Sequence, residues 1–326
     1  MKNNHYTNTI LELNKTITDR REFHKQSSLI LTQMIKDQDF WNEVFKHNLT
    51  DKGYLSRKWT MYEIPFLYVF ENDDFIMKIH LFVPLQNYAP HVLASAIHHH
   101  NNYLLTTVAA FGSGYETILF EKDFKVDLIT KEVNLKIKDH FTQEKRPVHM
   151  VDAWEPHMVV NPTSLSATLV LWSPDKKRAS DSLRNIPFLK AIKMPLRKLI
   201  YAFGLDKKFG IAAKETYQYF VKDNKFHAIL ENDFFEPTRT QAGEKVNDYS
   251  IQTVFAFMQR MKFNDINFLK KLQANPDVPK YYHKWIDKLI SGDLIQDTFA
   301  KEQINVPGGR MLVDDIIKAH KSVNNL

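Results

Sequence analysis

The stretch Ile97–Thr107, IHHHNNYLLTT, places three consecutive histidines between two apolar runs in a β-rich part of the chain. Side chains alternate between the two faces of a strand, so His98 and His100 point the same way and His99 points the other way. Two imidazoles on one face can chelate a divalent metal such as iron, zinc, copper or nickel. The stretch therefore predicts a metal site on a strand.

Two ligands do not complete a metal site, so a third must come from elsewhere in the chain. We expect it to be His157, which lies in the short β-rich segment WEPHMVVNP. The competing candidate is His149, in RPVHMVD.

Composition restricts the classes of protein that the chain can belong to. It has 326 residues, 44% of them hydrophobic, which is enough for a substantial core. It has no cysteine, which excludes disulfides, zinc ribbons, iron–sulfur clusters and a thiol nucleophile, and fits a reducing compartment. The formal net charge is +6 and the lysines are scattered, which argues against a nucleic-acid partner. Without a signal pattern or a run of about 18 to 20 apolar residues, we expect a cytoplasmic protein with no membrane span.

Hydrophobic periodicity divides the chain into three regions. Residues 1–60 are an N-terminal helical region, with helix predicted over 8–48, that packs on a β-barrel formed by 61–178; residues 179–326 return to helical spacing. Within the β-region, YLLTTVAAFG and YETILFE flank GSG and are predicted to pair as a hairpin. Many short strands separated by turns predict an antiparallel barrel or jelly roll. The predicted fold class is α+β, a barrel with N-terminal helices and a helical C-terminal region.

Two groups of residues in the β-region have a distinctive order and spacing. In the first, Ile97 and the histidines are followed, twelve residues after His100, by a glycine and then by an acidic residue and a threonine: Gly112, Glu116 and Thr117. In the second, Asp152 stands five residues before His157, and a later strand ends in Trp172-Ser173-Pro174. Over about residues 60–175 the chain resembles the cupin superfamily, and within it the cysteine-dioxygenase-like thiol dioxygenases.

The resemblance implies a cupin jelly roll that holds one mononuclear non-haem Fe(II) through three neutral histidines, His98, His100 and His157. Three of six positions around the ion would then be open to substrate and O2. Asp152 would orient a ligand histidine, or would only form a turn. Tyr103 would donate a hydrogen bond to O2 or substrate, or would only pack at the rim. Zinc, nickel or manganese could use the same ligands.

The chain departs from the thiol dioxygenases where they contact their substrate. Those enzymes have Ser, His and Tyr at alternate positions of the last strand, where this chain has Thr168, Val170 and Trp172. Their substrate-binding arginine would fall near Phe70 and their crosslinking cysteine near Leu105. We therefore expect a more apolar pocket, and a larger and less charged substrate than free cysteine.

Strand parity predicts which side chains line this pocket. In the family's register the lining comprises Leu105, Thr107, Val170 and Trp172. A slip of one residue would instead turn Trp172 outward and Leu171 inward. A charged handle for the substrate could come from arginines on loops, namely Arg146, Arg178 and Arg184.

Three functions fit these patterns. The first is an Fe(II)-dependent, dioxygenase-like cupin that acts with O2 on a small, fairly apolar metabolite. The second is a metal-dependent cupin with non-redox chemistry, such as a lyase or isomerase. The third is a cupin that senses a small molecule without catalysis, although the sequence contains no recognisable helix-turn-helix. The C-terminal helices would cap the pocket or form a homodimer contact.

Overall fold

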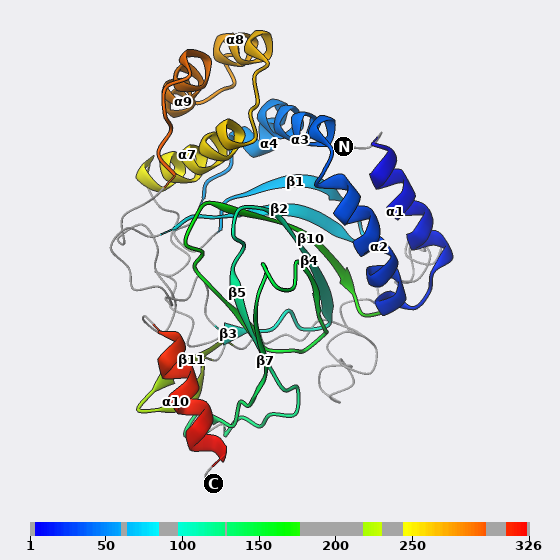
Figure 1. The fold of residues 1–326 in the computed structure, drawn as a ribbon, viewed down its shortest axis with the longest axis vertical. Helices are drawn as coiled ribbons and strands as arrows, with labels where there is room; N and C mark the ends of the chain where they lie inside the picture. The colour runs from blue at the N-terminus through cyan, green and yellow to red at the C-terminus, as the bar shows by residue number, and fades with distance from the viewer. Residues whose placement is uncertain are drawn as a thin grey trace, which may run out of the picture.

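The computed structural model describes residues 4–59, 64–84, 97–127, 129–176, 218–229, 244–297 and 311–324. Two antiparallel sheets curl around a common interior, and helices cover their outer faces (Figure 1). Most helices lie on one side of the barrel, and the C-terminal helix lies on the other. The fold is α+β, as the sequence predicts.

The two sheets contain twelve strands among the described residues. The five-stranded sheet has the order β1 (Phe66–Glu71), β2 (Ile76–Phe82), β10 (Ser166–Pro174), β4 (Tyr103–Phe111), β8 (Val148–Val151). The seven-stranded sheet has the order β6 (Glu132–Val133), β12 (Lys225–Ile229), β11 (Gln218–Lys222), β3 (Ile97–His98), β9 (His157–Val160), β5 (Glu116–Phe120), β7 (Ile137–Thr142).

Eight of these strands form a jelly roll. Strands β2, β10, β4 and β8 face β3, β9, β5 and β7, so that the chain passes repeatedly from one sheet to the other. This crossing pattern is that of two interleaved Greek keys. The jelly roll expected from the sequence is therefore confirmed by the order of the strands.

The predicted hairpin around Gly112-Ser113-Gly114 is wrong. β4 pairs with β10 and β8, whereas β5 pairs with β7 and β9 in the other sheet. The glycines form a corner between sheets rather than a turn within one. Gly112 has a φ of +76°, and a Cβ there would lie 2.2 Å from the carbonyl oxygen of Leu165, so only glycine fits.

The described part of the chain contains eight helices. The predicted N-terminal helix is in fact three, because Asn4, Asp19 and Asp37 each cap a new start with a side-chain oxygen. The helices are α1 (His5–Thr16), α2 (Arg20–Met34), α3 (Gln38–Thr50), α4 (Lys52–Leu55), α7 (Glu244–Arg260), α8 (Ile266–Ala274), α9 (Lys280–Ser291) and α10 (Val313–Asn324).

The main core lies between the five-stranded sheet and the helices. Phe23 of α2, Phe45 of α3 and Phe257 of α7 are buried in one cluster with Leu169 and Leu171 of β10. A second cluster lies under α10 on the outer face of the seven-stranded sheet. Each sheet therefore has a helix-covered outer face, which leaves its inner face for the interior of the barrel.

The prediction of helix throughout residues 179–326 is wrong over residues 218–229. There β11 and β12 form a hairpin, and β11 adds to the second sheet beside β3, with Gln218 opposite His98 and Tyr219 opposite Ile97. Tyr219 is fully buried. The strand β3, which carries His98, therefore has neighbours on both sides, β11 and β9, which restrains its position.

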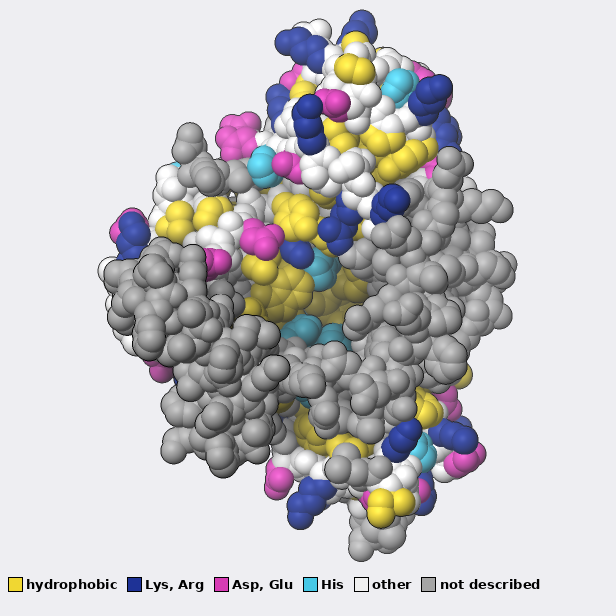
Figure 2. Space-filling model, turned by 180° about the vertical axis from the view of Figure 1, so that it is seen from behind, with side chains coloured by type: hydrophobic (Ala, Val, Ile, Leu, Met, Phe, Trp, Pro, Cys, Tyr) yellow, Lys and Arg dark blue, Asp and Glu magenta, His cyan; other side chains and the backbone are white. Residues whose placement is uncertain are grey.

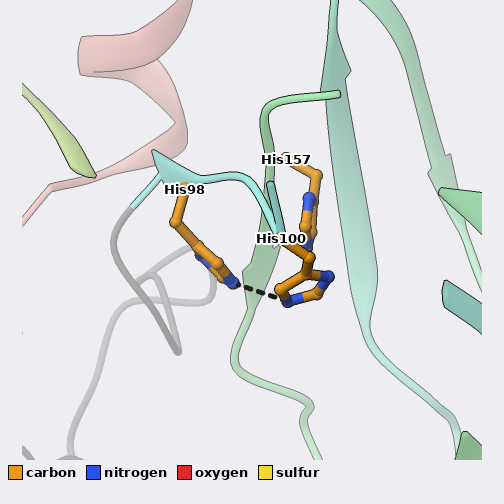
Figure 3. A group of neighbouring side chains, drawn as sticks. All are labelled: His98, His100 and His157. Atoms are coloured by element: carbon orange, nitrogen blue, oxygen red, sulfur yellow. Dashed lines mark hydrogen bonds between the residues drawn. The ribbon is translucent and has the colours of Figure 1, made fainter. Parts of the chain in front are cut away.

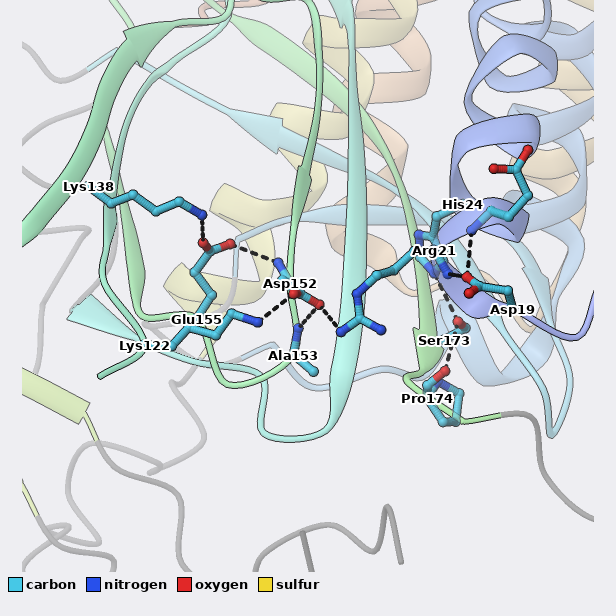
Figure 4. Close-up of polar contacts among 11 residues, drawn as sticks. Asp19, Arg21, His24, Lys122, Lys138, Asp152, Ala153, Glu155, Ser173 and Pro174 are labelled. Atoms are coloured by element: carbon cyan, nitrogen blue, oxygen red, sulfur yellow. Dashed lines mark hydrogen bonds and ion pairs between the residues drawn. The ribbon is translucent and has the colours of Figure 1, made fainter. Parts of the chain in front are cut away.

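A buried polar network joins α2 to the five-stranded sheet. The His24 ring bridges Thr106 of β4 (Nδ1 to Oγ1, 2.7 Å) and Ser173 of β10 (Nε2 to Oγ, 2.9 Å; Figure 4). The Nε of Arg20 also donates to the Ser173 hydroxyl, at 3.2 Å. Burial, with the charges of Arg20 and Arg21, lowers the pKa of His24 to about 3.

This pKa predicts a pH dependence of stability that His24→Gln should reduce. Between about pH 6.5 and 3 the unfolded chain binds a proton on His24 that the folded chain does not, so stability falls as the pH falls. The contribution is at most about 1.4 kcal/mol per pH unit. Urea unfolding at pH 4 to 7 should give a shallower pH slope for the variant. His5→Gln, at an exposed histidine, should keep the wild-type slope; equal slopes in His24→Gln and wild type would contradict the assignment.

Candidate metal centre

Three histidines converge inside one end of the barrel. His98 ends β3 and His157 begins β9, and the two lie directly opposite each other in the sheet. His100 follows β3 by two residues and turns back toward them (Figure 3). One ligand nitrogen of each histidine lies within 4.8 Å of those of the other two, and the Nε2 atoms of His98 and His100 are 3.2 Å apart.

Two of the three imidazoles, those of His100 and His157, are buried in surroundings that favour the neutral form. Burial, followed by the charges of the neighbouring histidines, holds the pKa values of His100 and His157 well below their ordinary value. The Nδ1–H of His157 donates to the carbonyl oxygen of Glu155 at 3.1 Å. That bond selects the tautomer whose Nε2 carries a lone pair, which is the form that binds metals.

The donor set fits a divalent transition metal. Three neutral nitrogens with no carboxylate or thiolate suit iron, zinc, copper or nickel. The Nδ1 of His100 is buried without a hydrogen-bond partner. An unpaired buried nitrogen is costly in a purely structural cluster. Within the described residues, this is the one group of three or more histidine, cysteine or acidic side chains positioned to hold a metal ion.

His99 and the competing candidate His149 lie elsewhere. His99 is 3% exposed, accepts a hydrogen bond from the backbone N–H of Asn101 at 3.1 Å, and packs against the rings of Trp154 and Tyr219. It thus points to the opposite face of β3, as parity predicts. His149 of β8 lies opposite Thr107 of β4, and its Nδ1 is 2.8 Å from the Thr107 hydroxyl, within hydrogen-bonding distance. The structure brings His157, and not His149, to the cluster.

Asp152 does not make the contact that the resemblance implies. Its carboxylate accepts from Arg21 of α2 at 2.6 Å and from the backbone N–H of Ala153 at 2.8 Å, and it pairs with Lys122 (Figure 4). Lys122 and Arg21 hold the pKa of this half-buried carboxyl below its usual value, against the effect of burial. Asp152 therefore links α2 to the loop before β9.

Glu155, which the sequence patterns did not single out, supports His157 directly. Its carboxylate is 1% exposed, pairs with Lys138 and accepts the backbone N–H of Asp152 at 2.8 Å. Its carbonyl receives the Nδ1–H of His157. A buried carboxylate thus fixes the short loop from which His157 emerges.

The predicted lining residues face the barrel interior. Leu105 and Val170 are buried in one interior cluster with Val151, and Trp172 packs against it. The Trp172 ring lies 5.8 Å from that of His100, edge to face. Leu171 belongs instead to the core under the helices, so β10 keeps the register that turns Trp172 inward.

Two further inward positions were predicted on β4. Thr107 is buried and hydrogen-bonds His149, one layer below Leu105. Tyr103 lies on the same face of β4 at its outer end, and its backbone N–H donates to the carbonyl of His100 at 3.0 Å. A role for either side chain in binding or catalysis stays a prediction.

The interior opens to solvent at this end of the barrel. Figure 2 shows a hollow over the centre of the barrel, with histidine and hydrophobic side chains on its walls. Inward-facing side chains near the cluster are only half-buried although they point into the barrel, among them His98, His100, Tyr103 and Trp172. A small molecule could therefore reach the histidines.

The inward face of β2 was missed at the sequence level. Lys78 and His80 lie opposite Val170 and Thr168 of β10, and residues that face each other across two strands share a face of the sheet. The His80 ring is 5.1 Å from that of Trp172. Its enclosure in the barrel and the charge of Lys78 lower the pKa of His80 to about 3. The sequence does contain a signal for this face, because polar and apolar residues alternate along β2: Lys78 and His80 between Met77, Ile79 and Leu81.

Among the described residues, the positions considered for a charged handle do not place one in the barrel. Phe70 packs against Phe75, with ring centroids 5.1 Å apart, and against the helical core rather than into the barrel. Arg146 pairs with Asp139 on the surface and lies over the Phe141 ring. Arg178 and Arg184 lie outside the described residues.

No protein-family model matches the chain, and no curated protein is significantly similar to it. A Klebsiella pneumoniae protein with a double-stranded beta-helix domain matches 38% of the chain and 94% of its own length, with 13% identity and a TM-score of 0.22. The Cnp3 cupin domain of Schizosaccharomyces pombe matches 37% of the chain and 66% of its own length, with 10% identity and a TM-score of 0.22.

An oxalate decarboxylase from Lactobacillus farciminis matches 44% of the chain but only 37% of its own length, with 12% identity and a TM-score of 0.21. These TM-scores are low, so the fold assignment rests on the strand order. Across the described parts of the chain, no helix is long and apolar enough to cross a membrane.

The geometry predicts which histidines a metal needs. Alanine at His98, His100 or His157 should each reduce binding from about one ion per chain to near zero, because two imidazoles remain. His99→Gln and His149→Gln should retain about one ion. Titration with Zn(II), followed by elemental analysis after desalting, measures the stoichiometry. Full retention by His157→Ala would remove that residue from the ligand set.

The position of Trp172 can be read from its fluorescence. Loading with paramagnetic Co(II) should quench wild-type emission more than Zn(II) does, because Trp172 stands against His100. Trp172→Phe should remove most of that cobalt-specific quenching. Trp285→Phe, a change at a tryptophan in α9, should leave it unchanged. Equal quenching in Trp172→Phe and wild type would place the indole away from a bound metal.

Proposed function

We propose that the chain is a metal-dependent enzyme of the cupin superfamily, in which His98, His100 and His157 hold one divalent ion. Fe(II) is the proposed metal, and the proposed reaction is the O2-dependent oxidation of a small, largely apolar metabolite in the cytoplasm. The observation that carries this proposal is the convergence of three histidines in an open barrel interior, with the pKa values of His100 and His157 held well below their ordinary value.

The chemistry of the donor set is compatible with the proposed iron. Three imidazoles without a carboxylate leave the ion its full positive charge and several free positions. Bound Fe(II) would supply a redox-active centre at which substrate and O2 come together. Zinc, nickel or manganese would fit the same donors and would support non-redox chemistry instead.

The protein's own contribution is to hold the ligands and shape the cavity. Glu155 keeps His157 in the tautomer that presents Nε2, and Lys138 keeps the Glu155 carboxylate in place. Trp172, Leu105 and Val170 form an apolar wall that would exclude water from around a bound substrate. Tyr103, at the outer end of β4, is proposed to donate a hydrogen bond to substrate or O2.

The lining supports an apolar substrate body rather than free cysteine. Thr168, Val170 and Trp172 replace the polar trio with which cysteine dioxygenases act beside their iron. Val170 and Trp172 contribute to the interior apolar cluster. The proposed partners are therefore a small organic molecule and O2.

Anaerobic purification followed by metal analysis and oxygen-electrode assays tests this proposal. The iron-loaded protein should consume O2 on addition of at least one member of an aryl- and alkyl-substituted metabolite panel. L-cysteine should give a rate at least tenfold lower, and the zinc-loaded protein should consume none. His100→Ala is the matched inactive control. A protein that retains zinc alone and consumes no O2 with any compound would favour non-redox chemistry and contradict the oxygenase.

A further inference from the structure

The inner face of β2 carries a histidine that is not part of the metal cluster. His80 lies opposite Phe66 of β1 and Thr168 of β10. Thr168 alternates with Val170 and Trp172 on the inward side of β10, so the His80 side chain projects from the inner face of the same sheet. It is half-buried, so part of the ring stays accessible within the barrel. His80 is therefore a lining residue and not a member of the helical core.

The surroundings of the His80 ring are aromatic. Three rings pack against it, with centroid distances of 5.1 Å for Trp172, 6.1 Å for Phe66 and 6.4 Å for Phe82. The hydroxyl of Thr168, across the strand pair, donates instead to Oε1 of Gln143 at 3.3 Å. Within the described part of the chain, the structure therefore gives the His80 ring neighbours but no hydrogen bond.

The His80 ring is a neutral imidazole near pH 7. Burial in the barrel wall, followed by the charge of Lys78, lowers its pKa to about 3. A neutral imidazole has one N–H that donates and one nitrogen that accepts. It can therefore pair with a neutral polar group but cannot offset the charge of an anion. A ring without a partner in a partly desolvated space costs free energy, which a ligand with a matching group would recover.

Trp172 connects His80 to the metal cluster. The indole packs against the His80 ring at 5.1 Å and against the His100 ring at 5.8 Å, the latter at an interplanar angle of 86°. Leu105 lies opposite Trp172 on β4, in the interior apolar cluster. A molecule lying against the indole would therefore meet His80 at one end and the three histidines at the other, with apolar surface between them.

We propose that His80 binds a neutral hydroxyl group of the substrate, and that the substrate is a small apolar molecule that carries this hydroxyl away from its reacting end. A hydroxyl both donates and accepts, so it pairs with either tautomer of the ring. The apolar body would lie against Trp172 and Leu105. This inference rests on the proposed function and narrows its substrate class. An analogue without the hydroxyl would bind poorly, because it leaves the imidazole without a partner.

The test compares a hydroxyl with a fluorine in zinc-loaded protein, which cannot turn over by oxidation. At pH 7 4-ethylphenol is uncharged, as a tyrosine side chain is, and calorimetry should show that it binds wild type about tenfold more tightly than 1-ethyl-4-fluorobenzene, or more. His80→Phe keeps a ring without its nitrogens and should reduce this preference to about twofold or less. His80→Gln, which retains a donor and an acceptor, should keep part of it. His5→Phe, at an exposed histidine, should behave as wild type.

The outcomes separate this inference from the metal proposal. Equal affinities in wild type, including no binding by either member across a panel of such pairs with different alkyl chains, would overturn the role of His80. A preference that survives in His80→Phe but is lost on zinc removal would assign the hydroxyl to the metal and overturn it too. Wild type that binds no zinc but shows a His80-dependent preference would support His80 and contradict the metal-dependent function. Zinc stoichiometry and melting temperature are measured in each sample, and His80→Gln decides the question if His80→Phe does not fold.

Discussion

The antiparallel pairing of β3 with β9, which puts His98 directly opposite His157, is the constraint on which the site depends. Side chains opposite each other in a sheet share a face, so this one pair sends both imidazoles into the barrel. A slip of one residue on either strand would turn one of them outward. The register is supported on both sides, since β11 holds β3 through Gln218 and Tyr219, and β5 holds β9 with Leu119 opposite His157.

The polarity of the side chains inside the barrel changes along its length. The histidine cluster lies at the open end. Below it, Leu105, Leu119 and Val151 belong to an apolar layer. Further in, polar side chains form hydrogen bonds with one another. Thr107 bonds His149, and the Thr168 hydroxyl donates to the side-chain oxygen Oε1 of Gln143 at 3.3 Å. Buried polar atoms without a hydrogen-bond partner occur at both levels, among them Nδ1 of His100 and Nε2 of Gln143.

Much of this arrangement followed from the sequence because it depends on local parity and spacing. The H-x-H face and the inward position of Trp172 need only the period of two in a strand and a correct register, and the choice of His157 also used its spacing from Asp152. The sheet partners of β4 and β5 could not be predicted from the sequence, because a corner between two sheets and a hairpin turn within one sheet can both be rich in glycine. The hairpin at 218–229 was missed for a related reason: Tyr219 and Phe220 fit either period, and only pairing with β3 selects the strand. Glu155 acts on His157 through its backbone carbonyl, which no side-chain pattern reports.

The position of Phe70 shows how one irregularity can misdirect a prediction made by alignment alone. The register of β1 against β2 shifts between Tyr68 and Phe70, which is the signature of a β-bulge. Up to Tyr68 the alternate residues face the barrel, and after the shift Phe70 packs under the helices beside Phe75. Counting positions from the family motif therefore reaches a residue that has left the interior wall. A single inserted residue on an edge strand thus changes which side chains of β1 face the interior without any change in the jelly roll.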